Sequence, residues 1–191
     1  MKKLIASLAL CGLATAPAFA ANFIGSTSAG NSVVADYSEA GLISFDLDLS
    51  DLAPVSLSYQ ITADDLLSGL DFNAVLRNLT GAGLNEVRFS LSLASFQTLG
   101  TVTRSFDTAY TVASSLGGQQ ALVSFGSPEY LDVAIGNPLG TNGAQNWVID
   151  TGNLQVGDVL TVTAAVPEPE SYVMALLGLA ALGAFARRRK A

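Results

Sequence analysis

The side chains in this sequence that could do chemistry are mainly carboxylates. Residues 21 to 166 include 14 acidic side chains and only three basic ones, a net charge of −11. Glu86, Glu129 and the aspartates could supply the two carboxyl groups of a glycosidase, and that chemistry needs no histidine. With so many acids, pairs also arise by chance. A surface polysaccharide hydrolase is therefore an alternative hypothesis and not the first one.

A second use of the acids would be to bind a hard cation. Asp46, Asp48 and Asp51, with Asp64 and Asp65 a loop away, could together offer oxygen ligands to calcium. Alternating acids on a strand are, however, also the ordinary solvated face of a sheet, and this spacing does not match a D-x-D-x-D-G loop. Calcium is a weak candidate, and we expect no required metal or cofactor.

Aromatic side chains offer a third kind of site. Trp147, Tyr110 and Tyr130 could stack on sugar rings, which keeps open a calcium-stabilised carbohydrate-binding module as another alternative. A single Trp within a strand is more often part of a sandwich core. The triplet Asn78-Leu79-Thr80 fits a glycosylation pattern, but it also fits a turn after a strand.

The residue types that the chain lacks exclude most common enzyme mechanisms. The sequence has no histidine, its one cysteine is Cys11, and its one lysine after Lys3 is Lys190. His-based catalysis, nucleophilic cysteine systems, His/Cys zinc sites and Schiff-base lysine chemistry are therefore excluded in residues 21 to 166. The acidic charge also disfavours nucleic-acid binding. We expect a protein that is not an enzyme.

The elements that must position these side chains are predicted to be strands. Residues 43–51, 54–62, 86–95 and 157–166 alternate apolar and polar residues, which is typical of half-buried strands. The side chains expected to point inward are Phe45, Leu47, Leu49, Val55, Leu57, Tyr59, Ile61, Val87, Phe89, Leu91, Leu93, Leu160, Val162 and Ala164. Shorter candidate strands lie at residues 32–36, 71–79, 108–114, 120–125, 130–135 and 146–150.

This pattern of nine to eleven short strands predicts an all-β fold, an antiparallel β-sandwich that is jelly-roll-like. Only residues 63–70 favour a helical turn. The glycine-rich stretch at residues 25–32 is expected to be a loose N-terminus of the mature chain.

The start of the chain, residues 1–20, has the pattern of a signal peptide. Lys2 and Lys3 precede an apolar stretch, and the small residues Ala18 and Ala20 mark a cleavage site after Ala20. A lipoprotein signal at Cys11 is disfavoured, because it would cut the apolar stretch in half. We therefore predict an exported chain whose residues 1–20 are removed.

The end of the chain has the pattern of a short membrane anchor. An apolar run from Tyr172 to Ala186 is followed by Arg187, Arg188, Arg189 and Lys190. As a single transmembrane helix this run would be about 22 Å long, against roughly 30 Å of hydrocarbon, which favours a transient anchor in the inner membrane. The basic cluster would stay in the cytoplasm and leave the body outside.

Pro167, Glu168 and Pro169, the apolar run and the basic terminus together resemble the PEP-CTERM sorting signal of exopolysaccharide-producing Gram-negative bacteria. The resemblance is confined to residues 166–191. It implies that an exosortase, a membrane-embedded processing enzyme, recognises and removes the tail as the protein is sorted. The Pro-Glu-Pro residues would then be substrate positions, and the prolines favour an extended segment.

Together these features predict three regions: a signal peptide at residues 1–20, a β-sandwich ectodomain at residues 21–165 and a sorting signal at residues 166–191. The expected location is the cell envelope, the outer surface or the extracellular matrix of a biofilm. The expected role is structural or adhesive among exopolysaccharides, with no catalysis.

Overall fold

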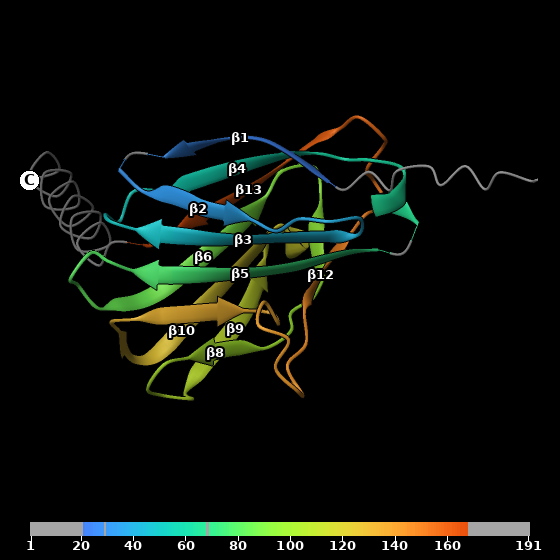
Figure 1. The fold of residues 1–191 in the computed structure, drawn as a ribbon. Coiled ribbons are helices and arrows are strands. Elements are labelled where there is room, and N and C mark those ends of the chain that lie inside the picture. Colours follow the sequence, from blue (N-terminus) through green and yellow to red (C-terminus); the bar gives the residue numbers. More distant parts are fainter. Residues whose placement is uncertain (1–20, 29, 68, 168–191) are drawn as a thin grey trace, which may run out of the picture.

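The computed structural model describes residues 21–28, 30–67 and 69–167. In this part of the chain, 13 β-strands and two 3-10 turns form two sheets that pack face to face (Figure 1). The all-β prediction is confirmed. The predicted signal peptide and the predicted transmembrane helix lie outside the described residues. Within them, no helix has the length and apolar character needed to cross a membrane.

The first sheet has six strands, and its order places the last strand of the body near the middle. Its strands, in spatial order, are β1 (Asn22–Ser28), β4 (Val55–Gln60), β13 (Val159–Ala165), β6 (Leu84–Leu91), β10 (Gln120–Glu129) and β9 (Tyr110–Ser115). Neighbouring strands in this sheet are all antiparallel.

The second sheet has seven strands and carries the surface groove described below. Its main path is β2 (Ser32–Asp36), β3 (Leu42–Leu49), β5 (Leu70–Asn78), β11 (Asp132–Ile135) and β8 (Val102–Arg104). Beside β5 lies β12 (Trp147–Asp150), which pairs in turn with β7 (Ser95–Thr98). The two short turns are η1 (Asp64–Leu66) and η2 (Leu116–Gly118).

The core between the sheets follows the predicted alternation closely. Of the 14 side chains predicted to point inward, 13 are buried and belong to one continuous apolar cluster. Leu93 is the exception. The chain leaves β6 after Leu91, and Leu93 lies in a turn with a φ of 62°, where its side chain is exposed. The prediction was wrong there because the alternation was continued past the end of the strand.

Trp147 belongs to this core and is not a sugar-stacking platform. Its side chain is fully buried, and its ring packs against Phe72, Phe89 and Phe96 with centroids 5.4 to 6.1 Å apart. The indole Nε1 donates a hydrogen bond to the carbonyl oxygen of Thr101 (3.3 Å). The only polar atom of the ring is thus satisfied inside the sandwich, as a buried Trp requires.

The prediction that all strands are antiparallel was wrong for one pair. Strands β3 and β5 are neighbours and run parallel, with Leu42 opposite Asp71 and Leu49 opposite Asn78. Parallel neighbours need a long crossover. Here the chain crosses to the first sheet as β4 and returns through η1 before β5 begins. The sheets are therefore mixed, and the jelly-roll arrangement stays a prediction.

The expected loose N-terminus was also wrong. Residues Asn22–Ser28 form β1, which pairs with β4 from Asn22 opposite Gln60 to Ser28 opposite Val55. Because β1 lies at the edge of its sheet, its side chains are mostly exposed. The alternation of apolar and polar residues is therefore weak, and the sequence gives little sign of a strand. The helical turn predicted in residues 63–70 is confirmed as η1.

Candidate functional site: a polar groove on the second sheet

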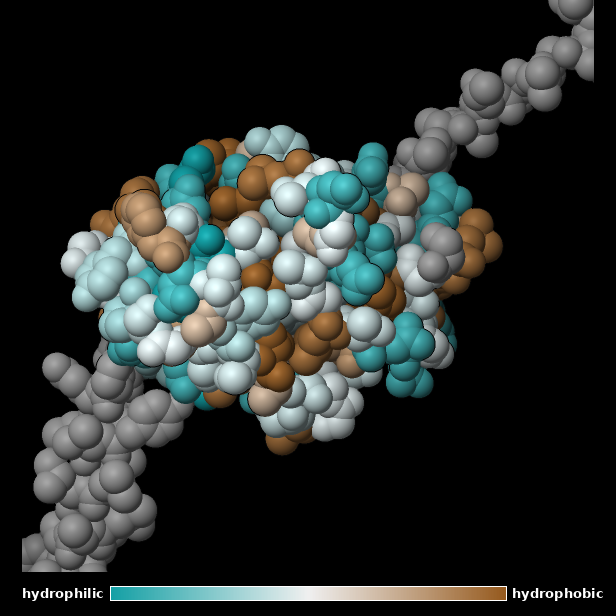
Figure 2. All heavy atoms as spheres, turned by 90° about the horizontal axis from the view of Figure 1, so that it is seen from below, coloured by the Kyte–Doolittle hydropathy of each residue, from teal (hydrophilic) through white to brown (hydrophobic). Residues whose placement is uncertain are grey.

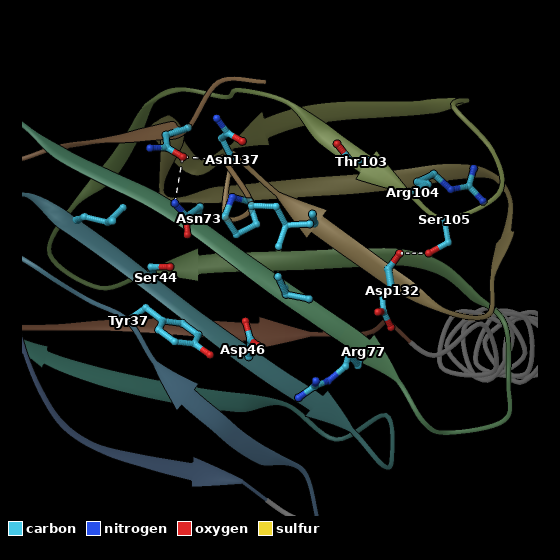
Figure 3. Close-up of a pocket in the computed structure, with 16 residues that line it drawn as sticks. Tyr37, Ser44, Asp46, Asn73, Arg77, Thr103, Arg104, Ser105, Asp132 and Asn137 are labelled. Atoms are coloured by element: carbon cyan, nitrogen blue, oxygen red, sulfur yellow. Dashed lines mark hydrogen bonds between the residues drawn. The ribbon is translucent and has the colours of Figure 1, made fainter. Parts of the chain in front are cut away.

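The outer face of the second sheet is hollowed into an open groove of about 820 Å³. Its floor is formed by the outward side chains of β3, β5, β11 and β8, which alternate with the buried core residues of the same strands. Figure 3 shows Tyr37 and Asp46 on one side of β5, and Thr103 and Asp132 on the other.

Strand register determines which polar side chains meet on this floor. The parallel pairing of β3 with β5 places Ser44 beside Asn73, and Asp48 beside Arg77. On the other side of β5, Arg77 lies opposite Asp132. The groove floor therefore carries a basic side chain between acidic ones on the two neighbouring strands.

Arg77 is held by the acid that lies beside it on β3. Its Nε donates a hydrogen bond to the carboxylate of Asp48, and this bond is the main reason that the pKa of Arg77 is raised above its ordinary value. Arg77 is thus fully cationic, and it adds donor groups to a floor that otherwise has many acceptors.

One wall of the groove is the loop between β11 and β12, and asparagines hold it in place. The side-chain oxygen of Asn146 accepts hydrogen bonds from the Asn73 side chain (3.1 Å) and from the Asn137 backbone (3.0 Å). Its Nδ2 donates to Asp71 (3.0 Å). At Gly136, where φ is 71°, a Cβ would come within 2.8 Å of the backbone of Phe72, so the loop can lie this close only with glycine.

Asn73 leaves one acceptor unused at the floor of the groove. The residue is only 3% exposed, and its Oδ1 is buried with no hydrogen-bond partner in the described structure. A buried acceptor without a partner costs about 1–3 kcal/mol. Such an atom marks a place where a bound hydroxyl or water would stabilise the structure.

Tyr37 forms the opposite rim and is the aromatic group of the groove. It follows β2, and its backbone NH donates to the carbonyl oxygen of Ser44 (2.8 Å), which fixes it beside β3. The side chain is 60% exposed. An exposed ring at the rim of a polar groove can pack against a flat apolar surface of a ligand.

The groove thus combines one exposed aromatic ring with amide, carboxylate, hydroxyl and guanidinium groups. This set can donate and accept many hydrogen bonds to a neutral polar ligand, and its open shape admits a chain as well as a small molecule. Two carboxylates, Asp46 and Asp132, line it from strands on opposite sides of β5. Two strand spacings across the sheet and two residues along it separate their backbones by roughly 12 Å.

The calcium candidates do not converge. Asp46 lines the groove, Asp48 pairs with Arg77, and Asp51 accepts hydrogen bonds from Asn31 and from the backbone NH of Ala53 in a turn. Asp65 is fully buried, and its carboxylate accepts bonds from Gly41 and Thr62, so it anchors η1. In the described ranges, no three His, Cys, Asp or Glu residues form a group suited to a metal.

The two glutamates considered for hydrolysis lie apart from each other and outside the groove. Glu86 is on β6, where it accepts a hydrogen bond from the Ser124 hydroxyl. Glu129 is buried at the end of β10, where its carboxylate binds Arg104 Nε (3.1 Å) and the backbone NH groups of Tyr130 and Leu131. Neither glutamate can reach a ligand in the groove.

Arg104 and Glu129 are the centre of a buried polar cluster that the sequence did not reveal. All five N–H groups of Arg104 are used: by Glu129, by Asp107, by the carbonyl oxygen of Ala109 and by both oxygens of Ser127. Its guanidinium carbon also lies 5.0 Å from the ring centre of Phe125. The cluster fixes the turn between β8 and β9 against the turn between β10 and β11.

Asp107 should make the stability of this cluster depend on pH. The backbone NH of Ala109 and the Ser127 hydroxyl, with Arg104, lower the pKa of Asp107 to about 2 from an ordinary 3.8. A lowered pKa favours the folded state wherever the carboxyl is ionised. We expect Asp107→Asn to reduce the free energy of unfolding by the same amount at all pH values above about 5, and the difference to disappear as pH falls towards 2. Urea unfolding at several pH values measures this difference, and a gap that persists at pH 2 would contradict the assignment.

Of the other sequence candidates, Tyr110 and Asn78 have structural roles, and Tyr130 is exposed outside the groove. Tyr110 is partly buried, and its hydroxyl accepts a hydrogen bond from Val102 NH (3.3 Å). Asn78 is buried, and its Nδ2 donates to the carbonyl oxygens of Ala82 (2.6 Å) and Glu129 (3.0 Å), so the triplet forms a turn. Tyr130 is exposed, at the end of the body and away from the groove.

The sorting signal begins directly at the edge of the folded body. Ala165 is the last residue of β13 and pairs with Arg88 of β6. Val166 packs against the core, and Pro167 is half-buried. Glu168, Pro169 and the basic residues of the tail lie outside the described residues, as do Ala18 and Ala20. No spacer therefore separates the last strand from the Pro-Glu-Pro tripeptide.

The described residues form a two-sheet β domain with an open polar groove, and the Pro-Glu-Pro tripeptide follows directly after its last strand. A family model described as the PEP-CTERM protein-sorting motif matches residues 165–190. The chain therefore carries this sorting motif, which implies export, processing by an exosortase and a transient stay at the membrane during sorting at the cell envelope. Searches of curated proteins and of solved structures found no match to the chain.

Proposed function

We propose that this protein is a non-catalytic surface protein that binds exopolysaccharide in the groove of its second sheet after its tail has been processed. The sorting motif supports the location, and the groove supports the binding. The observation that carries the binding role is an open groove lined by amide, carboxylate and guanidinium groups, with the exposed ring of Tyr37 at its rim.

A polysaccharide suits this groove by its chemistry. Sugar hydroxyls donate and accept hydrogen bonds, which matches the mixed set of amides, carboxylates and the Arg77 guanidinium on the floor. The apolar face of a sugar ring matches Tyr37. An open groove accepts an internal stretch of a long chain, whereas an enclosed pocket would accept only an end.

Several features support a binding role without turnover. The backbones of Asp46 and Asp132 lie roughly 12 Å apart on either side of β5, whereas the carboxyl groups lie about 5 Å apart in retaining glycosidases and about 6.5–9.5 Å apart in inverting ones. Arg77 belongs to β5, the strand between them, and lies directly opposite Asp132.

The binding role is tested with the purified body and matrix polysaccharide from the producing cells. We expect the polysaccharide to retain the protein on a column or in a pull-down, with no new reducing ends after long incubation. Release of reducing ends that is lost in Asp46→Asn or Asp132→Asn would instead establish the hydrolase. Absence of both retention and turnover would leave a purely structural protein and refute the proposal.

The sorting role is tested by changing the tripeptide. In the native host, replacing Pro167, Glu168 and Pro169 with alanine should leave an exported protein that keeps its basic terminus, because the processing enzyme loses its recognition segment. The mass of the protein recovered from each cell fraction reports both cleavages. Glu170→Ala is the matched control, since it removes an adjacent acid outside the tripeptide, and it should be processed normally.

Truncation gives an independent check on the same role. A chain without residues 167–191 should be exported but lost to the medium, because the membrane-sorting step requires the tail. Retention of this truncated chain at the surface, at the level of the full chain, would show that the tail does not sort the protein.

A further inference from the structure

The end of the body from which the chain leaves β13 carries exposed apolar side chains. Leu79 follows β5, Phe106 follows β8, and Tyr130 and Leu131 lie between β10 and β11; all four are exposed. We call these four side chains the tail-end patch. Figure 2 shows apolar side chains at this end, the left end in both views, where β3 and β5 finish in Figure 1.

Hydrogen bonds place the three turns of the tail-end patch side by side. The backbone NH of Asn78 donates to the carbonyl oxygen of Leu131 (3.3 Å), which brings the turn after β5 next to the turn before β11. The Ser105 hydroxyl donates to the carbonyl oxygen of Asp132 (3.1 Å), which adds the turn that carries Phe106. The tail-end patch is therefore one surface.

The tail-end patch is also rigidly supported from beneath. Glu129 holds the backbone NH groups of Tyr130 and Leu131, and Arg104 holds the segment around Phe106 through Asp107 and Ala109. Phe106 is 84% exposed even though its neighbours are fixed. A fixed turn that presents a phenylalanine to water indicates a surface that meets an apolar environment.

The short segment between the body and the apolar run limits how far this end of the body can lie from the membrane. Six residues, 166 to 171, separate the end of β13 from the apolar run that begins at Tyr172. Fully extended, they span at most about 20 Å. The headgroup layer on one side of a bilayer is roughly 5–8 Å thick. If the apolar run enters the bilayer, this end of the body lies no more than about 15 Å from the headgroup surface.

We propose that the tail-end patch is a membrane-docking surface, with which the body rests on the outer leaflet of the membrane until the tail is cut. The inference rests on the proposed function in one respect: the apolar run of the tail must be inserted in the membrane. Phe, Leu and Tyr are suited to the interface between headgroups and hydrocarbon. Asp107 and Asp132 lie at the edge of the patch and repel anionic lipid, so the expected partner is a zwitterionic surface.

Docking would also orient the substrate for its processing enzyme. Because Pro167 is half-buried and follows β13 without a spacer, an enzyme in the membrane must approach the tripeptide from the tail end of the body. A body that rests on the headgroups through this end presents the tripeptide at the membrane surface. In this orientation the groove of the second sheet faces sideways and stays open to polysaccharide.

Single labels can test the docking, because Cys11 lies in the leader and the mature chain has no other cysteine. The mature chain, residues 21–191, is reconstituted into phosphatidylcholine vesicles with an environment-sensitive fluorophore on Phe106→Cys. Leu67→Cys is the matched control, since Leu67 is 81% exposed and lies near η1 at the opposite end. A third label, on Leu177→Cys, reports insertion of the tail.

Docking predicts a blue shift in the emission of the label at position 106 and protection from aqueous iodide, with no change at position 67. Added salt should not reverse the shift. Equal, water-like emission at positions 106 and 67, with the label at position 177 in lipid, would refute the docking and leave the proposed function intact. A water-like signal at position 177 would overturn the docking, because the docking requires an inserted tail, and would leave the polysaccharide binding to its own test. A shift at position 106 that needs anionic lipid and disappears with salt would also refute apolar docking.

Discussion

Replacing Glu129 with alanine should lower the free energy of unfolding by about 3–5 kcal/mol, because it leaves the Arg104 guanidinium buried without its partner. The same change removes the acceptor for the backbone NH groups of Tyr130 and Leu131. Urea unfolding, followed by the fluorescence of Trp147 in the core, measures the loss. The variant should also loosen the turns that carry the tail-end patch.

Two further variants separate the buried charge from the loss of side-chain volume. Glu86→Ala shortens a glutamate on the outer face of the first sheet, and it should change stability by no more than about 0.5 kcal/mol. Replacing Arg104 by methionine together with Glu129 by leucine removes both charges and should recover only part of the loss, because the backbone NH groups of Tyr130 and Leu131 still lack their acceptor. A Glu129→Ala variant as stable as Glu86→Ala would show that the ion pair does not hold this end of the body.

The sequence predicted the sandwich well where strands are long and half-buried. In β3, β4, β6 and β13 apolar and polar residues alternate over most of the strand, so most inward residues could be named from the sequence alone. Ile43 and Leu84, near the starts of β3 and β6, are also buried in the core and were not named. Strands were missed where the alternation of apolar and polar residues is weak or where the strand is short. The last four residues of β1 are Gly, Ser, Thr and Ser, and β7 and β8 have only four and three residues, so the formation of these strands depends on partners distant in sequence.

The groove was less predictable, since it depends on which strands become neighbours. Asp46 was considered as an acid on a strand, but nothing local shows that Asn73, Arg77 and Asp132 lie beside it. The parallel pairing of β3 with β5 brings them together, and that pairing needs a crossover through the other sheet. Tyr37 follows a predicted strand directly, so a search for aromatic residues at strand ends could have found it.

The acids also show why counting residue types gave too many hypotheses. Asp48, Asp51, Asp65 and Glu129 each accept hydrogen bonds from a specific partner inside the body. An acid-rich sequence therefore does not imply that many acids are available for catalysis or metal binding. In contrast, the sorting tail could be recognised from sequence alone, because its recognition depends on the order of short segments and not on tertiary contacts.

Replacing Tyr37 with alanine should weaken retention by matrix polysaccharide roughly tenfold while leaving stability nearly unchanged. Truncation of a tyrosine that makes a main contact with a ligand can cost more than about 1 kcal/mol. A cost of about 1.4 kcal/mol corresponds to a factor of ten in affinity. The residue is 60% exposed, so the core loses little packing. Affinity electrophoresis in gels that contain the polysaccharide measures the change.

Tyr130→Ala is the matched control, since Tyr130 is 58% exposed and lies outside the groove. It removes the same ring at nearly the same exposure, so it reports any general effect of losing a surface tyrosine. We expect normal retention for this variant. Equal weakening in both variants, or in neither, would mean that the groove is not where the polysaccharide binds. Loss in Tyr37→Ala alone, with an unchanged unfolding midpoint, would place the sugar chain against the rim formed by β2 and β3.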